Sequence, residues 1–94
     1  MWFDLPFFET LPAIVKIRVL YYALLREQVG CDQEDVEVAE GGSLSELFES
    51  LRTRHGFKIK PHQLKVAVNE AFVGWDQVLS DKDTVAFIPP FAGG

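Results

Sequence analysis

IVKIRVLYY, at residues 14–22, is the most strongly patterned run of this 94-residue chain. It is rich in β-branched and aromatic residues, and Lys16 and Arg18 alternate with apolar neighbours. This composition and a period of two predict a β-strand with one face or edge in water. Strong helix formers follow at residues 23–28 and end before Gly30, which predicts a short helix with a glycine C-cap.

A second strand and a longer helix are predicted next. DVEVA at residues 35–39 alternates polar and apolar side chains, so we expect a strand antiparallel to the first. Ser43 and Glu46 have the spacing of a capping box, in which each residue satisfies a free backbone N–H of the other. Apolar residues then recur at helical spacing until Gly56, where we expect the helix to end.

The C-terminal third reads as two or three strands. KVAVN at residues 65–69 is followed by a tight turn at residues 69–70 and a short return strand at residues 72–73. TVAFI at residues 84–88 is the last predicted strand. Two prolines at residues 89–90 end it, because proline cannot donate to a β-ladder.

This order of elements predicts an α+β domain over residues 14–90, with a mixed four- or five-stranded sheet covered by one main helix. The β-grasp, ubiquitin-like arrangement satisfies the order, and in it the first and last strands are central neighbours. The predicted core residues are Ile17, Val19, Leu44, Leu47, Phe48, Leu51, Val66, Val68, Val85 and Phe87.

The last residues, 91–94, are predicted to form a flexible projecting tail. The two preceding prolines favour an extended exit from the sheet, and Gly93 and Gly94 have no Cβ, so this end can enter a narrow channel. A terminal carboxylate is a poor electrophile until it is activated. We therefore interpret the tail as an arm that presents a reactive group to other proteins.

Composition excludes several functions. A net charge of −5 argues against nucleic-acid binding, and no run approaches the roughly 18 apolar residues of a membrane span. The single cysteine, Cys31, suits a reducing compartment such as the cytoplasm, and we interpret it as an incidental loop residue. His55 and His62 lack metal-ligand spacing, so we expect no bound metal or cofactor. The only basic cluster is Arg52, Arg54, Lys58 and Lys60, which we interpret as a solvated helix end.

Residues 1–13 form an N-terminal extension that is apolar but carries Asp4, Glu9 and two prolines. Without a basic start it does not have the pattern of a signal peptide. Two interpretations are open. Either the start is mis-assigned and Val15 is the true initiator, or the segment packs on an exposed apolar face.

Three runs carry a family resemblance: VLYYALLRE at 19–27, VAVNE at 66–70 and DTVAFIPPFAGG at 83–94. Together they resemble the small subunit of molybdopterin synthase, a ubiquitin-like sulfur carrier. The resemblance implies that a partner enzyme adenylates Gly94 with ATP and that a sulfur donor enzyme converts it to a thiocarboxylate. The sulfur then passes to cyclic pyranopterin monophosphate in the large subunit, which holds the catalytic site. Gly93 gives the clearance that the tail needs to enter that site.

The resemblance also implies a surface for the large subunit. The matching positions are Tyr22, Arg26, Phe72, Ile88 and Phe91. Aromatic residues rimmed by arginine are typical of the centre of an interface. One departure is Lys82, where the family usually has glycine in a tight turn. Because lysine is disfavoured at positive φ, we expect this turn to take a different form.

Three other functions fit the same fold and tail. The chain could be a protein modifier joined to lysines through Gly94, or a carrier for another acceptor, such as the thiamine thiazole or a tungsten cofactor. The Pro-Pro-x-x-Gly-Gly ending argues against the thiamine carriers. The third is an interaction domain with an inert tail.

Overall fold

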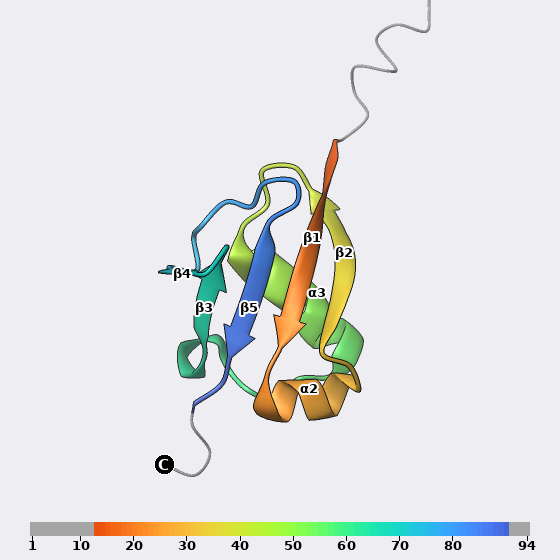
Figure 1. Cartoon of the computed structure of the whole chain (residues 1–94), viewed down its shortest axis with the longest axis vertical. Coiled ribbons are helices and arrows are strands. Elements are labelled where there is room, and N and C mark those ends of the chain that lie inside the picture. The colour runs from red at the N-terminus through yellow and green to blue at the C-terminus, as the bar shows by residue number, and fades with distance from the viewer. Residues whose placement is uncertain (1–12, 91–94) are drawn as a thin grey trace, which may run out of the picture.

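The computed structural model describes residues 13–90, which form one mixed sheet, a long helix behind it and a shorter helix at one end (Figure 1). The strands are β1 (Ile14–Tyr21), β2 (Gln33–Ala39), β3 (Lys65–Val68), β4 (Ala71–Val73) and β5 (Thr84–Ile88). The helices are α2 (Ala23–Val29), α3 (Leu44–His55) and the 3-10 turn η1 (Pro61–Gln63). In these residues no helix is long and apolar enough to cross a membrane.

The sheet order is β2-β1-β5-β3-β4. β1 pairs with β2 in the antiparallel sense and with β5 in the parallel sense, with Val19 opposite Val85. β3 pairs antiparallel with both β5 and β4. A parallel pair requires a crossover connection, and the chain between β1 and β5 includes α3, which crosses the back of the sheet. This is the β-grasp, ubiquitin-like fold predicted above, with its first and last strands adjacent.

The core lies between α3 and the sheet. Every predicted core residue is buried. Phe48 of α3 meets Phe87 of β5 with ring centroids 5.4 Å apart, so the helix and the central strand share an aromatic contact. The core also includes residues that were not predicted: Val15, Tyr21, Leu25, Val36, Phe57, Leu64 and Leu79.

The predicted caps are present at both ends of α3 and at the end of α2. The Oγ atom of Ser43 accepts a hydrogen bond from the amide of Glu46 at 3.3 Å, and the Glu46 carboxylate accepts one from the amide of Ser43 at 3.0 Å. Gly56 ends α3 with a φ of 74°, and Gly30 ends α2 with a φ of 90°. Glycine suits both positions because a Cβ atom disfavours this left-handed conformation.

Three local features differ from the prediction. β2 begins at Gln33 rather than at residue 35, because Gln33 pairs with Leu20 of β1. The turn η1 was not predicted. The expectation for Lys82 is wrong: its φ is 71°, in the left-handed region that favours glycine. The amide of Lys82 donates to the carbonyl of Lys16 at 2.7 Å, and this bond helps to hold the residue there.

Candidate functional site

The face of the sheet opposite α3, here called the outer face, is uncovered in the described part of the chain and is turned toward the viewer in Figure 1. Alternate residues of neighbouring strands point to this face. The register places Leu20 of β1 beside Ala86 of β5, Ala86 beside Ala67 of β3, and Ala67 beside Phe72 of β4. The resulting apolar patch comprises Leu20, Tyr22, Ala67, Phe72, Ala86 and Ile88, which line one groove together with Asn69, Glu70 and Thr84.

A two-residue turn places Phe72 in the patch. Asn69 and Glu70 have φ angles of 52° and 73°, and two successive positive φ values are typical of a tight hairpin with the right strand twist. The Asn69 side chain also accepts from the amide of Thr84 and donates to Asp83, each at 2.9 Å. These bonds attach the hairpin to β5, so the patch is built on a rigid support.

Tyr22 and Phe72 are the most exposed members of the patch. Tyr22 is 45% exposed and Phe72 is 70% exposed, and Ile88 is half-buried between them in the groove. The predicted partner residues Tyr22, Phe72 and Ile88 are therefore brought together. Contiguous exposed apolar surface of this kind marks a site of interaction with another molecule.

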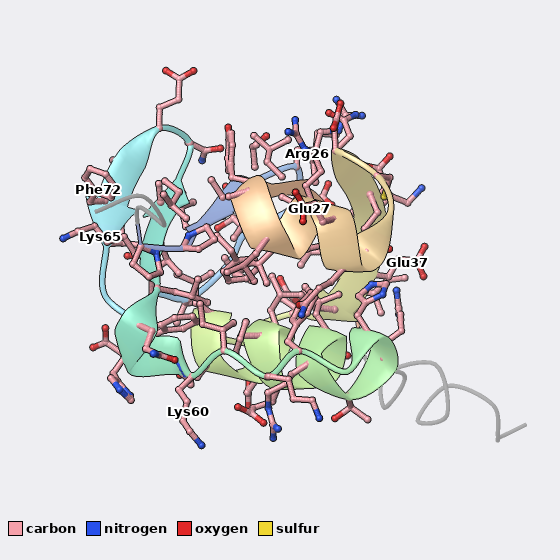
Figure 2. The ribbon with its side chains drawn as sticks, turned by 90° about the horizontal axis from the view of Figure 1, so that it is seen from below. Arg26, Glu27, Glu37, Lys60, Lys65 and Phe72 are labelled. Atoms are coloured by element: carbon pink, nitrogen blue, oxygen red, sulfur yellow. The ribbon has the colours of Figure 1, made fainter. Side chains whose placement is uncertain are left out.

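Arg26 lies beside the patch rather than in its groove. It lines a neighbouring hollow with Leu20 and Tyr22, and its Nη1 atom is 3.6 Å from a carboxylate oxygen of Asp32. Figure 2, which looks at the end where α2 lies, shows Arg26 on the side away from α3 and Phe72 at the β4 edge. The arginine is thus a charged rim to the apolar patch.

The chain leaves the sheet next to this patch. Ile88 pairs with Lys65, Pro89 is buried and Pro90 is exposed. In Figure 1 this exit lies at the same end of the sheet as α2. The predicted site residues Phe91, Gly93 and Gly94 lie outside the described residues, so their roles stay predictions.

The other half of the outer face is charged. A separate hollow there is lined by Lys16 and Arg18 of β1 and by Lys82 of the loop before β5, together with Thr84 and Asp35. These three cations are here called the cationic strip. The Nε atom of Arg18 is 3.1 Å from a carboxylate oxygen of Asp35. The face is therefore apolar where the tail leaves it and cationic where β1 begins.

A partly buried polar cluster joins the sheet to the end of α3. Glu34 accepts hydrogen bonds from the hydroxyl of Tyr21 and from Nε2 of His55, the second at 2.8 Å, and Arg54 lies 3.5 Å away. Burial alone would raise the pKa of Glu34. The hydrogen bonds from Tyr21 and His55 and the nearby positive charges outweigh that effect, so the pKa of Glu34 lies below its ordinary value.

The same contact acts on Tyr21 in the opposite direction. Burial, and then the hydrogen bond to the Glu34 carboxylate, raise the pKa of Tyr21 above its ordinary value. Sequence reasoning missed this cluster. It uses His55 in a structural contact, and among the described residues no group of three or more His, Cys, Asp or Glu side chains could hold a metal ion. Cys31 is an exposed free thiol.

The chain matches proteins of known family over most of its length. Residues 19–94 match the ThiS family. The molybdopterin synthase sulfur carrier subunit of Mycobacterium tuberculosis is 36% identical over 86 residues, and the match covers 86% of this chain and 100% of that protein.

Solved structures agree with this match. A putative molybdopterin converting factor, subunit 1, from Pyrococcus furiosus has a TM-score of 0.72 and 35% identity, and the match covers 82% of this chain and 99% of that one. A ubiquitin from Caldiarchaeum subterraneum has a TM-score of 0.61 at 15% identity, over 87% of this chain and 100% of that one, and this likeness concerns the fold alone.

The match from Val19 to Gly94, the β-grasp fold and the full-length alignment with a sulfur carrier subunit lead to one conclusion: this chain belongs to the ThiS family and is a relative of the molybdopterin synthase sulfur carrier subunits.

Proposed function

We propose that this chain is the sulfur carrier subunit of a molybdopterin synthase. The observation that carries the proposal is its 36% identity to a protein of that name over the whole length of that protein. The family match also runs through Gly93 and Gly94, so the residues that the chemistry needs lie inside the shared region.

The proposed reaction takes place at the carboxylate of Gly94. A partner enzyme transfers AMP from ATP to this carboxylate and releases pyrophosphate, which gives the carbonyl carbon a good leaving group. Sulfur from a donor enzyme then displaces AMP and leaves a thiocarboxylate. Its sulfur is a nucleophile at neutral pH and replaces an oxygen substituent on a carbon of cyclic pyranopterin monophosphate. Water then cleaves the bond between this sulfur and the Gly94 carbonyl carbon, so the sulfur stays on the pterin and the carboxylate of Gly94 is restored. Two such transfers supply the two sulfurs of the dithiolene.

The apolar patch is the surface proposed to bind the large subunit. Tyr22, Phe72 and Ile88 provide exposed apolar area beside the point where the chain leaves the sheet, and Arg26 adds a charged rim. A partner that covers this patch lies next to the base of the tail. Phe91 and Gly93 are proposed to pass into the large subunit with Gly94.

In this proposal the chain carries a group and the large subunit performs the catalysis. The carrier itself binds no cofactor, and ATP is used by the adenylating partner. The cytoplasm suits this role, because its reducing conditions keep thiols such as the exposed Cys31 reduced.

Intact mass spectrometry tests the chemistry. The chain is incubated with ATP, a sulfur donor and an adenylating enzyme, and the expected product gains the mass of one sulfur and loses the mass of one oxygen. A variant without Gly94 is the control and stays unmodified. An unchanged mass for the complete chain, with a known carrier thiocarboxylated in the same mixture, contradicts the proposal.

The same preparation separates the rival functions. A protein modifier would form lysine-linked conjugates with other proteins in cell extract, which appear as branched peptides ending in Gly93-Gly94. A carrier for the pterin would instead deliver its sulfur to cyclic pyranopterin monophosphate when the large subunit is added. Molybdopterin, detected as its fluorescent oxidation product, is the expected result.

A further inference from the structure

The side chains of the outer face change from charged to apolar along β1. From the start of the strand, the cationic strip comes first, with Lys16, Arg18 and Lys82, and the apolar patch follows, from Leu20 to Tyr22. Any segment that runs along this face from the beginning of β1 therefore meets positive charge before it meets apolar surface.

Residues 1–12, which lie outside the described part of the chain, carry the complementary order. Read backward from Pro12, the first charged residue is Glu9, and the residues that follow it are mostly large and apolar, with one further acid at Asp4. These apolar residues are Phe8, Phe7, Leu5, Phe3 and Trp2. The segment has no basic residue, so its charge is opposite to that of the cationic strip.

The length of the segment suits the distance. Twelve extended residues span up to about 40 Å, whereas the eight residues of β1 rise about 26 Å. A segment that reverses direction near Pro12 can therefore run the full length of the face. Proline at that position favours a change in chain direction, because its own N–H cannot extend the β1 ladder.

We infer that residues 1–12 fold back over the outer face of their own chain, with Glu9 at the cationic strip and the aromatic residues on the apolar patch. The occupant of the exposed groove is thus a segment of the same molecule. The family match covers residues 19–94, so this contact is an addition to the shared fold.

Such a cover competes with any partner of the patch. A tether makes the local concentration of the segment high without any new contact. If the segment covers the patch about nine-tenths of the time, it weakens partner binding about tenfold. Only this consequence for the large subunit rests on the proposed function, because the contact within the chain needs no sulfur chemistry.

A spin label on the complete 94-residue chain tests the contact. The label is attached to an Asp4→Cys variant in which Cys31→Ser removes the natural thiol. We expect its paramagnetic effect to broaden the amide signals of Phe72 and Ile88, and to spare those of Glu49 and Arg52 on α3. Equal effects on both groups, or no effect on either, would overturn the inference.

Two further samples make the result specific. Replacing Phe3, Phe7 and Phe8 with serine in the labelled chain should abolish the broadening at Phe72, since the apolar contact is lost. The second sample is a mixture of two preparations. One carries the spin label at natural isotope abundance, and the other is isotope-labelled and carries no spin label. This mixture should show no broadening. Broadening in the mixture would mean that the segment covers a second copy, which contradicts an intramolecular cover.

Charge reversal tests the position of Glu9. Glu9→Lys should weaken the broadening at Phe72, and a chain that also carries Lys16→Glu and Lys82→Glu should recover it. Recovery is expected only if these charges meet, so its absence counts against the proposed alignment. Failure here would leave the mass-spectrometric test of Gly94 unaffected, so the two proposals can fail separately.

Discussion

The two faces of the sheet are made by the same strands and differ in almost every property. On β1, the inward residues Val15, Ile17, Val19 and Tyr21 are all buried. Their outward neighbours Ile14, Lys16 and Arg18 are exposed. One face packs on α3, and the other presents the cationic strip and the apolar patch to the surroundings.

This difference separates stability from recognition. The inward side chains hold the helix on the sheet, so their loss leaves cavities in a close-packed core. The outward side chains contribute little to that core and are available to bind another surface. The patch is nevertheless supported by the backbone pairing of the sheet, because every residue that presents it lies on or next to a hydrogen-bonded strand.

Two phenylalanines provide the largest test of this separation. Phe87 is 0% exposed and Phe72 is 70% exposed. Phe87→Ala should lower the free energy of unfolding by about 3–5 kcal/mol, because it opens a cavity against Phe48. Phe72→Ala should change it by less than about 0.5 kcal/mol. Urea denaturation followed by circular dichroism measures both. Equal losses in the two variants would show that the outer face is part of the core.

Binding should show the reverse ranking. Phe72→Asp places a charge on the most exposed side chain of the apolar patch and should weaken binding to the large subunit by about 2 kcal/mol, or about 30-fold. Lys60→Asp, on the side of α3 in Figure 2, is a control that should leave the affinity unchanged. Isothermal titration calorimetry gives both values. A stronger effect of Lys60→Asp would move the interface to the opposite face.

Acid should lower the stability of the fold through Glu34, whose cluster joins the sheet to the end of α3. The pKa of this carboxylate is lowered in the folded chain from its ordinary value of 4.5. Its contribution to stability is therefore complete above about pH 4.5 and is lost as the pH falls through the lower folded-state pKa. Glu34→Gln should cost about 1–2 kcal/mol at pH 7 and should flatten the dependence of stability on pH in this acid range.

The control for this prediction is Glu37→Gln. Glu37 lies on the same strand, is exposed and takes no part in the cluster, so its replacement should change the free energy of unfolding at pH 7 by less than about 0.5 kcal/mol. Thermal unfolding at a series of pH values between neutral and strongly acidic compares the variants. Parallel curves for the original chain and Glu34→Gln would show that the Glu34 cluster adds nothing to acid sensitivity.

The helices, their caps and most of the strands were predictable because their signals are local. The alternation in residues 14–22, the Ser43–Glu46 spacing and the prolines after residue 88 each constrain the backbone at their own position. The order of these elements along the chain then limits the number of ways in which the strands can pair in one sheet beside one main helix. The β2 boundary was missed because pairing with β1, rather than the composition of β2, sets where that strand begins.

The site was only partly predictable. Tyr22, Phe72 and Ile88 were named from the family resemblance, whereas Leu20, Ala67 and Ala86 join them through the strand register. The cluster around Glu34 had no local signal at all. Glu34 meets Tyr21 from 13 residues away and His55 from 21 residues away, and no periodic pattern encodes such a contact.

The smallest effect is expected at Lys82, where a side chain of the outer face and a strained backbone conformation occur in one residue. It belongs to the cationic strip, yet its φ of 71° is unfavourable for any residue with a Cβ atom. Lys82→Gly should raise the free energy of unfolding by about 0.5–1 kcal/mol, because relief of this conformation exceeds the added entropy of glycine in the unfolded chain. Gly56→Ala is the control, because it adds a Cβ atom at a similar backbone conformation instead of removing one. Its φ is 74° and a Cβ atom there would meet nothing within 4 Å, so backbone conformation alone should make that change destabilising. Thermal melts of both variants should therefore shift in opposite directions. A loss of stability in Lys82→Gly would mean that the lysine side chain contributes more to the fold than its backbone conformation costs, and the outer face would then share in the stability assigned above to the inner one.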